Sequence, residues 1–357
     1  MAKYVSKAPA SNGAKTVGLW IARGLVALVV FIVVLALTLF FSLNIICGDT
    51  SPKAKQTFIT TILETGQLKF LASWFLSPEE IQSVVDSNSM QQMNDAVDSN
   101  LVDINGAETA GEDIEIIKIP ERNFEATLMK VKDPSRISLA SIYPWRDKGV
   151  TLDELVTSNE AVAGINGGLY ASDNNTGGRP YGVAVSNGEI QLNEPSRFKG
   201  LVLVGFTEEH LLEIISIDGM SAAEVEKLIT EKKIRDAVTF QEESSDVNNH
   251  FVQLVINGKP RGMNGMGSGL NPRTAIGQCA DGSVLLLVTD GRGKSGHLGA
   301  SASDLIDIMM EYGAVNAANL DGGSSSCMYY EDEYLMTSVT FYYSNDSWRM
   351  PVAFIVK

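Results

Sequence analysis

The 357-residue chain is 45% hydrophobic and 20% charged, which is the composition of an ordinary globular protein. Its length allows two domains, or one domain with additional segments. The formal net charge is −15, and this acidic excess argues against binding to nucleic-acid phosphates, which requires a basic face. We therefore expect no nucleic-acid partner.

The N-terminal segment is apolar and carries only positive charge. Residues 1–48 contain no Asp or Glu, and residues 24–48 contain no charged residue at all. As a helix, residues 24–48 would span about 37 Å, more than a hydrocarbon core of about 30 Å requires. A cleaved signal peptide is the alternative, but its apolar region is usually shorter, and no small-x-small cleavage site follows Leu43. We predict an uncleaved transmembrane signal anchor at residues 24–48.

The flanking charges predict the orientation of this anchor. All positive charges of the segment precede it, at Lys3, Lys7, Lys15 and Arg23. The positive-inside tendency then predicts a cytoplasmic tail at residues 1–23, a single pass through the cell membrane and an extracellular remainder. That remainder carries 24 basic and 43 acidic residues, a net charge of −19 that would keep an exported domain soluble.

Residues 49–115 are predicted to form a helical stalk and an acidic linker. Residues 58–75 have a helical pattern, and a second helix begins at a capping box formed by Ser77 and Glu80. Residues 93–113 are acidic and lack periodicity, which is typical of a solvated linker. We expect this region to hold a head domain away from the membrane.

Residues 116–357 are predicted to form the catalytic domain. They contain many short β-rich runs bounded by glycine, including the hairpin dipeptides Asn187-Gly188, Asn257-Gly258 and Asp281-Gly282. Helical patterns at 152–159, 221–234 and 301–313 are interspersed. This pattern predicts a mixed α+β fold with largely antiparallel sheets, preceded by one transmembrane helix and the stalk.

Two cysteines, Cys279 and Cys327, lie in the part of the chain that is predicted to be exported. In an oxidising compartment they could form one disulfide, but small buried thiols are equally common. The sequence leaves both possibilities open.

Two glycine-rich stretches suggest a site. INGG places the amide of Asn166 beside Gly167 and Gly168, which would let the backbone approach a ligand. GMNGMGSGLNPRTAIG, residues 262–277, satisfies neither nucleotide-binding glycine motif. It does place Arg273 directly before a predicted strand, and a guanidinium group suits a phosphate or a carboxylate.

Two further stretches supply acids and bases. VTDGRGKSGHLG places Asp290 at the end of a buried strand and follows it with Arg292 and His297. NLDGGSSS surrounds Asp321 with small and hydroxyl residues, namely Gly322, Gly323, Ser324 and Ser325. No helical pattern follows Asp321, so a helix-capping role explains it poorly.

These stretches, NGG, RTAIG, DGR and NLDGG, occur in an order that resembles the phosphodiester glycosidase family. The likeness runs from about Phe124 to Val356 and includes RMPVAFIV, with Arg349 before the last predicted strand. The chain departs from the family pattern at Cys327, where a hydroxyl residue is usual, and at residues 206–250, which we interpret as an insertion.

The resemblance implies hydrolysis of a sugar-1-phosphate diester, such as an N-acetylglucosamine-1-phosphodiester in wall or exopolysaccharide glycans. Asp321 and Asp290 are the expected acid, base or nucleophile, and His297 would shuttle a proton. The remaining candidates would bind phosphate or sugar: Arg273, Arg292, Arg349, Asn166, Gly167, Gly168, Gly322, Gly323, Ser324 and Ser325.

Three alternatives remain open from the residues. A metal-dependent phosphodiesterase would bind Ca²⁺ or Mg²⁺ through Asp290, Asp321, Asn319 and His297, although no compact ligand spacing is present. Asp173-x-Asn175 hints at a calcium loop but lacks its later glycine and glutamate. The other two alternatives are a non-catalytic glycan-binding module and an exopolysaccharide assembly protein. No cofactor is otherwise expected.

Overall fold

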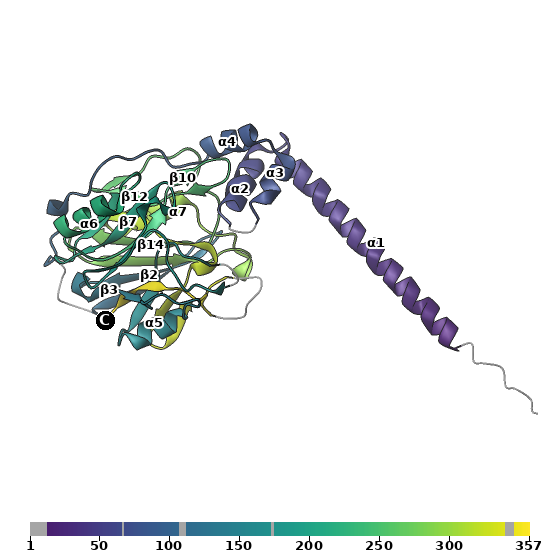
Figure 1. Cartoon of the computed structure of the whole chain (residues 1–357). Helices are drawn as coiled ribbons and strands as arrows, with labels where there is room; N and C mark the ends of the chain where they lie inside the picture. Colours follow the sequence, from purple (N-terminus) through teal and green to yellow (C-terminus); the bar gives the residue numbers. More distant parts are fainter. Residues whose placement is uncertain (1–12, 66–67, 107–111, 173–174, 340–345) are drawn as a thin grey trace, which may run out of the picture. The chain divides into compact units, whose positions relative to one another are not determined.

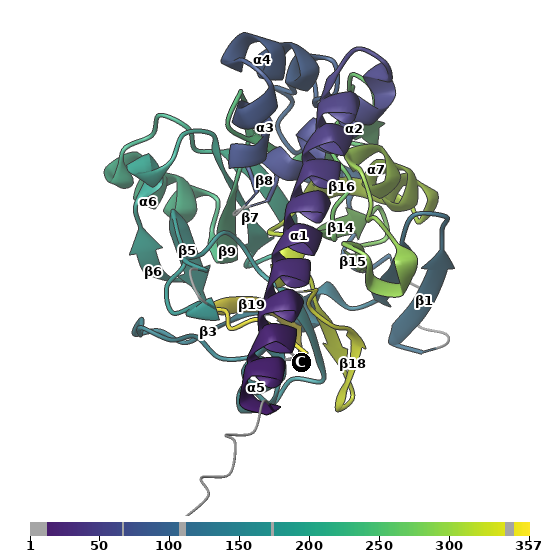
Figure 2. The same cartoon turned by 90° about the vertical axis from the view of Figure 1, so that its right-hand side faces the viewer.

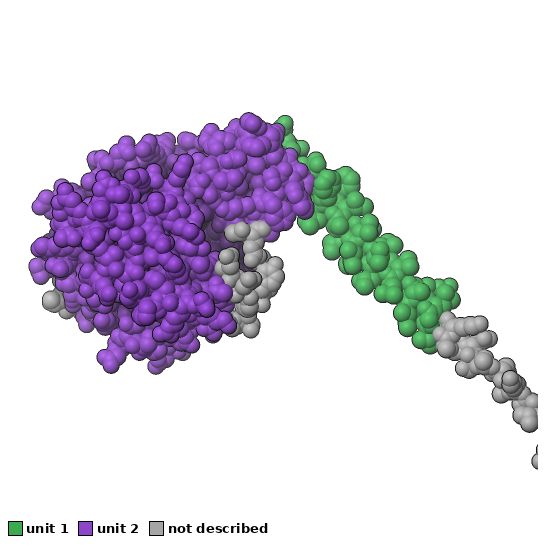
Figure 3. Space-filling view, viewed as in Figure 1, with its two compact units in different colours: residues 1–55 green, residues 56–357 purple. Residues whose placement is uncertain are grey.

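The computed structural model describes residues 13–65, 68–106, 112–172, 175–339 and 346–357. The chain divides into two compact units, residues 1–55 and 56–357, which Figure 3 shows in separate colours. We describe each unit by itself.

The first unit is dominated by the long helix α1 (Gly13–Cys47). Its part from Thr16 to Cys47 is long and apolar enough to cross a membrane, and none of its most apolar stretch is buried. All of the predicted anchor except Gly48 therefore lies within a helix that suits a membrane span or a signal anchor. Its orientation across a membrane stays a prediction.

The second unit is built on three antiparallel sheets (Figure 1). Within the described residues, the largest sheet has the order β1-β2-β15-β14-β16-β12-β13, and two others have the orders β18-β17-β4-β19-β3 and β6-β5-β9-β7-β8. A small hairpin pairs β10 with β11. Helices are interspersed, so the predicted α+β class is confirmed.

The strands have the following bounds: β1 Ile114–Pro120, β2 Glu125–Val131, β3 Ile137–Ser141, β4 Ala163–Asn166, β5 Val183–Ser186, β6 Glu189–Asn193, β7 Leu201–Thr207, β8 Leu212–Ser216, β9 Ile234–Gln241, β10 Glu243–Ser244, β11 Asn249–His250, β12 Gln253–Ile256, β13 Lys259–Pro260, β14 Thr274–Cys279, β15 Val284–Thr289, β16 Ala314–Asn319, β17 Met328–Tyr330, β18 Glu333–Met336 and β19 Val352–Val356. The helices of this unit are α2 Pro52–Leu63 (which begins four residues before the division), α3 Phe70–Phe75, α4 Pro78–Asp86, α5 Leu152–Ser158, α6 Ala222–Glu231 and α7 Ala302–Glu311.

Local sequence signals explain where several elements begin and end. Asn187-Gly188 and Asn257-Gly258 both have positive φ at each residue, as a two-residue hairpin turn requires. Ser77 caps α4 through a reciprocal capping box, as predicted, and Ser221 caps α6 in the same way at the start of the predicted helical pattern. Ser301 caps α7, and Gly313 follows that helix with a φ of 84°.

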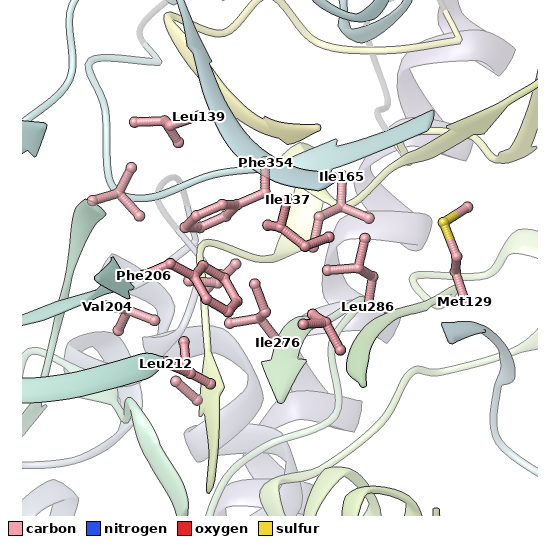
Figure 4. Close-up of a cluster of buried hydrophobic side chains, with 14 of the residues drawn as sticks. Met129, Ile137, Leu139, Ile165, Val204, Phe206, Leu212, Ile276, Leu286 and Phe354 are labelled. Atoms are coloured by element: carbon pink, nitrogen blue, oxygen red, sulfur yellow. The ribbon is translucent and has the colours of Figure 1, made fainter. Parts of the chain in front are cut away.

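The main core lies where the three sheets meet (Figure 4). Phe206 from β7 and Phe354 from β19 form an edge-to-face pair with ring centroids 6.3 Å apart. Ile276 from β14 joins the same fully buried cluster, so each sheet contributes to it. Each such side chain contributes roughly 1.5–3 kcal/mol through burial, which fixes the sheets against one another.

Residues 206–250, interpreted above as an insertion relative to the family pattern, are built into one of the sheets. They supply β8, α6 and β9, and β9 pairs with both β5 and β7 in the middle of its sheet. The stretch is therefore an integral part of this domain.

Helices α2, α3 and α4 lie together at one end of the second unit (Figure 2). The following segment also stays on the domain: Met90 forms a bridge with Met263, the N–H of Asp98 donates to Asn257 Oδ1, and the N–H of Asp103 donates to the carbonyl of Ala280. Up to residue 106, this segment is therefore not a solvated linker, because its backbone groups form hydrogen bonds with the domain. Residues 107–111 of the expected linker lie outside the described residues, and the domain boundaries stay a prediction.

The cysteines are three separate buried thiols. Cys279 ends β14 and its thiol donates to the carbonyl of Tyr312, whereas Cys327 lies beside Ser347. Of the two possibilities left open by the sequence, the structure has the unpaired thiols.

Candidate active site

The candidate residues come from strand ends that meet at one edge of the large sheet. Asp290 follows β15, Arg273 precedes β14 and Asp321 follows β16, and these three strands are antiparallel neighbours in that order. Neighbouring strands are about 4.8 Å apart, so the backbones at Asp290 and Asp321 are roughly 10 Å apart across the sheet. Distant loops are thereby gathered at one edge.

The side chain of Asn166 joins this edge to the sheet that contains β4. Its amide nitrogen donates to the carbonyl of Asp321 (2.6 Å), and its oxygen accepts from the hydroxyl of Thr274 (2.6 Å) and the N–H of Cys327 (3.3 Å). The residue is fully buried. Asn166 therefore holds the turn that carries Asp321, and both its amide nitrogen and its amide oxygen bond to protein groups.

Asp321 is enclosed but still partly exposed. Burial raises the pKa of its carboxyl group to about 6, although hydrogen bonds from the hydroxyl of Ser325 and the N–H of Gly322 and the charge of Arg292 act in the opposite direction. The N–H of Gly322 lies 3.0 Å from the carboxylate. A carboxyl group that titrates near neutral pH is suited to proton transfer.

Arg292 faces the same turn. Its Nη1 donates to the hydroxyl of Ser324 (2.9 Å), and its Nε donates to the side-chain oxygen of Asn271 (3.3 Å). Burial, together with the neighbouring charge of Arg273, lowers the pKa of the guanidinium to about 10, although the charges of Asp321 and Glu64 act in the opposite direction. Arg292 and Asp321 attract each other but form no ion pair within 4.0 Å.

Arg273 is buried and bound within the protein. Its guanidinium forms an ion pair with Glu64 and donates to Ser268 Oγ (3.1 Å) and to the carbonyl of Gly269 (2.8 Å). It also lies over the ring of Phe251, 5.0 Å from the centroid. With 6% of its surface exposed, Arg273 is placed to support the loops rather than to contact a phosphate.

Asp290 and His297 form a pair. The carboxylate of Asp290 lies 2.7 Å from His297 Nδ1 and also accepts the N–H of Glu125 at 2.7 Å. Asp290 is buried, whereas the ring of His297 is partly exposed. This geometry fixes the orientation of the imidazole and leaves its Nε2 without a partner among the residues that the structure describes.

The remaining candidates have mostly structural contacts. A Cβ atom at Gly167 or Gly168 would crowd Val352 or the backbone of Thr239, so this pair lets the chain pass between strands. Arg349 donates to the carbonyl of Gly149 at 3.1 Å. Asp173 of the calcium-like pattern lies outside the described residues.

Sequence reasoning missed three residues that contact the site. The hydroxyl of Tyr170 lies 2.9 Å from Ser325 Oγ, and Glu64 and Asn271 bind Arg273 and Arg292 respectively. Tyr170 was within the GINGGLY stretch, but nothing in the sequence distinguished it from a core tyrosine. Glu64 lay more than 200 residues from its partner, in a segment interpreted as a stalk.

Among the described residues, no three His, Cys, Asp or Glu side chains gather into a group that could hold a metal ion.

The model of the phosphodiester glycosidase family matches residues 159–357, more than half of the chain. The chain belongs to the phosphodiester glycosidase family. This match includes Asn166, Arg273, Asp290 and Asp321, and it confirms the resemblance found in the motifs. The family is one of glycosidase-like hydrolases.

A solved structure shares the fold of this phosphodiester glycosidase domain. The catalytic domain of zebrafish N-acetylglucosamine-1-phosphodiester alpha-N-acetylglucosaminidase, auto-inhibited by its pro-peptide, is 14% identical and superimposes with a TM-score of 0.53 over 70% of this chain and 85% of that chain. A hypothetical protein from Synechocystis is 16% identical, with a TM-score of 0.42 over 68% of this chain and 62% of that chain.

A curated relative is similar over a shorter stretch. The SPbeta prophage-derived uncharacterized protein YomE of Bacillus subtilis (strain 168) is 38% identical over 65 residues, which is 18% of this chain and 10% of YomE. The chain thus matches only a small part of that relative's length.

Proposed function

We propose that this protein hydrolyses the glycosidic bond of a sugar-1-phosphate diester. The observation that carries the proposal is the turn where Asp321, with a pKa near 6, and the cationic Arg292 face each other without pairing. A carboxyl group and a guanidinium group in this arrangement suit a substrate whose anomeric carbon bears a phosphate.

The proposed chemistry breaks the bond between the anomeric carbon and its phosphate oxygen. The oxygen of water becomes attached to the anomeric carbon, and the phosphate monoester leaves with the bonding electrons. Arg292 would stabilise the charge on the leaving phosphate. Asp321 would either take the proton from water or attack the anomeric carbon directly, and these two routes give opposite stereochemistry.

The Asp290–His297 pair would exchange protons at the same edge of the sheet. Asp290 is buried and bound to Nδ1, so it would orient the ring, while the partly exposed His297 would carry the proton. This assignment gives the two aspartates different roles.

The location and natural substrate belong to the same proposal. Helix α1 suits a signal anchor, and the acidic remainder of the chain suits an extracytoplasmic domain. The substrate class would be an N-acetylglucosamine-1-phosphodiester in cell-wall or exopolysaccharide glycans. This choice rests on the family and on the zebrafish enzyme of similar fold.

The test incubates the purified full-length chain with a panel of sugar-1-phosphodiesters in water enriched in oxygen-18. Hydrolysis at carbon places the heavy oxygen on the sugar, whereas hydrolysis at phosphorus places it on the phosphate. Label on phosphate, or loss of all turnover with a chelator, would favour the metal-dependent phosphodiesterase. No turnover of any diester would contradict the proposal.

The two arginines provide a second test. Arg292→Ala is expected to lower kcat/KM much more for phosphodiesters than for aryl glycosides. Arg273→Ala should lower both equally and destabilise the fold by about 3–5 kcal/mol, because it leaves Glu64 buried and unpaired. A phosphate-specific loss in Arg273→Ala alone would reverse these roles.

A further inference from the structure

Glu64, directly after α2, connects this helix to the loops of the active site. Its Oε1 accepts the N–H of Gly269 (2.7 Å) and the amide of Asn249 (3.1 Å). Its Oε2 accepts the amide of Asn271 (3.1 Å) and the guanidinium of Arg273. The side chain is 1% exposed, so both carboxylate oxygens are used within the protein.

The glycine-rich stretch 262–271 packs closely against α2 and against Asn88, which follows α4. A Cβ atom at Gly269 would clash with the backbone of Thr61 in α2, and one at Gly265 would lie 2.5 Å from Asn88 Oδ1. The hydroxyl of Thr61 accepts the N–H of Leu270 at 3.0 Å. This close fit accounts for the glycines of a stretch that matched no nucleotide motif.

A chain of hydrogen bonds runs from Glu64 to Arg292. Asn271 donates its amide to Glu64 Oε2 and to the carbonyl of Thr61, so its side-chain oxygen points the other way and accepts Arg292 Nε. Arg292 then donates to Ser324, in the turn that carries Asp321. Rotation of Asn271 would remove one of the two bonds that orient the guanidinium.

We propose that Glu64 is a positioning residue of the active site, which orients Arg292 through Asn271 and offsets the charge of Arg273 beside it. The proposal rests on the proposed function of Arg292 and Asp321. It makes the region predicted as a stalk a required part of the catalytic unit, rather than a spacer.

The charges around the turn predict a measurable effect. The charge of Arg292 lowers the pKa of Asp321, and the pKa of Arg292 is in turn affected by the charges of Arg273, Asp321 and Glu64. Without the negative charge of Glu64, Arg273 is uncompensated, and the local potential becomes more positive. The ionised form of Asp321 is then favoured, and its pKa falls.

The experiment compares Glu64→Gln with Glu242→Gln in the full-length chain. Glu242 is a matched control because it also pairs with a buried arginine, Arg261, which contacts the carbonyls of Gln91 and Gln253 instead of the active-site turn. The titration of Asp321 is followed by carbon-13 NMR of its carboxyl group, assigned with Asp321→Asn. Kinetics with a sugar-1-phosphodiester are measured across the same pH range.

We expect Glu64→Gln to move the Asp321 titration to lower pH by several tenths of a unit and to lower kcat/KM more than tenfold. Glu242→Gln should lose stability without moving the titration. If Glu64→Gln folds poorly, Asn271→Ser retains the Glu64–Arg273 pair and should still shift the Arg292 Nε–H resonance and lower kcat/KM.

Two results would overturn this role. The first is an Asp321 titration in Glu64→Gln that stays at the wild-type pH, together with an Arg292 Nε–H resonance in Asn271→Ser that stays at the wild-type position. The other is a rise in kcat/KM for phosphodiesters in Glu64→Gln, which would mean that the carboxylate blocks an anion site on Arg273. If the wild type hydrolyses no diester, the proposed function fails, but the NMR titration still tests the positioning role.

Discussion

The guanidinium of Arg292 occupies the space that a side chain at Gly323 would fill. A Cβ atom built on Gly323 would be 2.6 Å from Arg292 Nη2, and the backbone there has a φ of 64°. Glycine at this position therefore serves two purposes: it allows the left-handed backbone, and it leaves room for the cation beside Asp321.

Gly323→Ala should accordingly displace Arg292 and lower kcat/KM for phosphodiesters at least tenfold. It should also destabilise the fold by about 1 kcal/mol through backbone strain. Gly188→Ala is the matched control, because Gly188 has a φ of 76° but no atom within 4 Å of the added Cβ. Equal kinetic effects of the two variants would show that strain alone is responsible.

Asp321→Asn is expected to reduce turnover about 100-fold or more, because it removes the proton-transfer or nucleophilic group. Steady-state kinetics measure this loss.

The free energy of unfolding should also depend on pH through Asp321. The folded-state pKa of about 6 is above the unfolded value of about 3.9, so the protonated carboxyl stabilises the fold at low pH, and this contribution is lost as pH rises through about 6.

Urea unfolding at several pH values between 4 and 7 measures how the free energy of unfolding changes with pH. The stability of the wild type relative to Asp321→Asn should fall as pH rises across the range. Asp307→Asn, at an exposed position on α7, serves as the control for the loss of a carboxylate outside the site. A relative stability that rises with pH would contradict the burial of the Asp321 carboxyl.

Asp290 and His297 should behave as one functional unit. Because Asp290 acts through the ring that it orients, Asp290→Asn and His297→Gln should each lower kcat, and the double variant should be little worse than the more impaired single variant. Steady-state kinetics of the four proteins measure this coupling. Losses that multiply would instead indicate that Asp290 contacts the substrate independently.

Asn166→Ala should cost about 2–4 kcal/mol of unfolding free energy, because it leaves buried groups of Asp321, Thr274 and Cys327 without their partner. Denaturant unfolding measures this loss. Thr274→Val removes only one of the three bonds and should cost less. Unchanged stability with lost activity would return Asn166 to the ligand-binding role that the sequence suggested.

The sequence was sufficient to predict the features that depend on local physics. Twenty-five uncharged residues predicted the apolar helix, Asn-Gly dipeptides predicted hairpin turns, and Ser77 and Ser221 predicted helix starts. Each of these features depends on a few neighbouring residues, whose conformational preferences are independent of the rest of the chain. Motifs in a fixed order likewise predicted the family.

Only the tertiary structure determined which groups meet and what each one contacts. Asp290 and Asp321 had equal claims as catalytic acids in the sequence, but one orients His297 and the other faces Arg292. The sequence suggested that Arg273 could bind a phosphate, but the structure pairs it with Glu64, which is more than 200 residues away in the chain. Burial and long-range pairing set the charge and reach of such groups, and both arise only when distant strands and helices pack together.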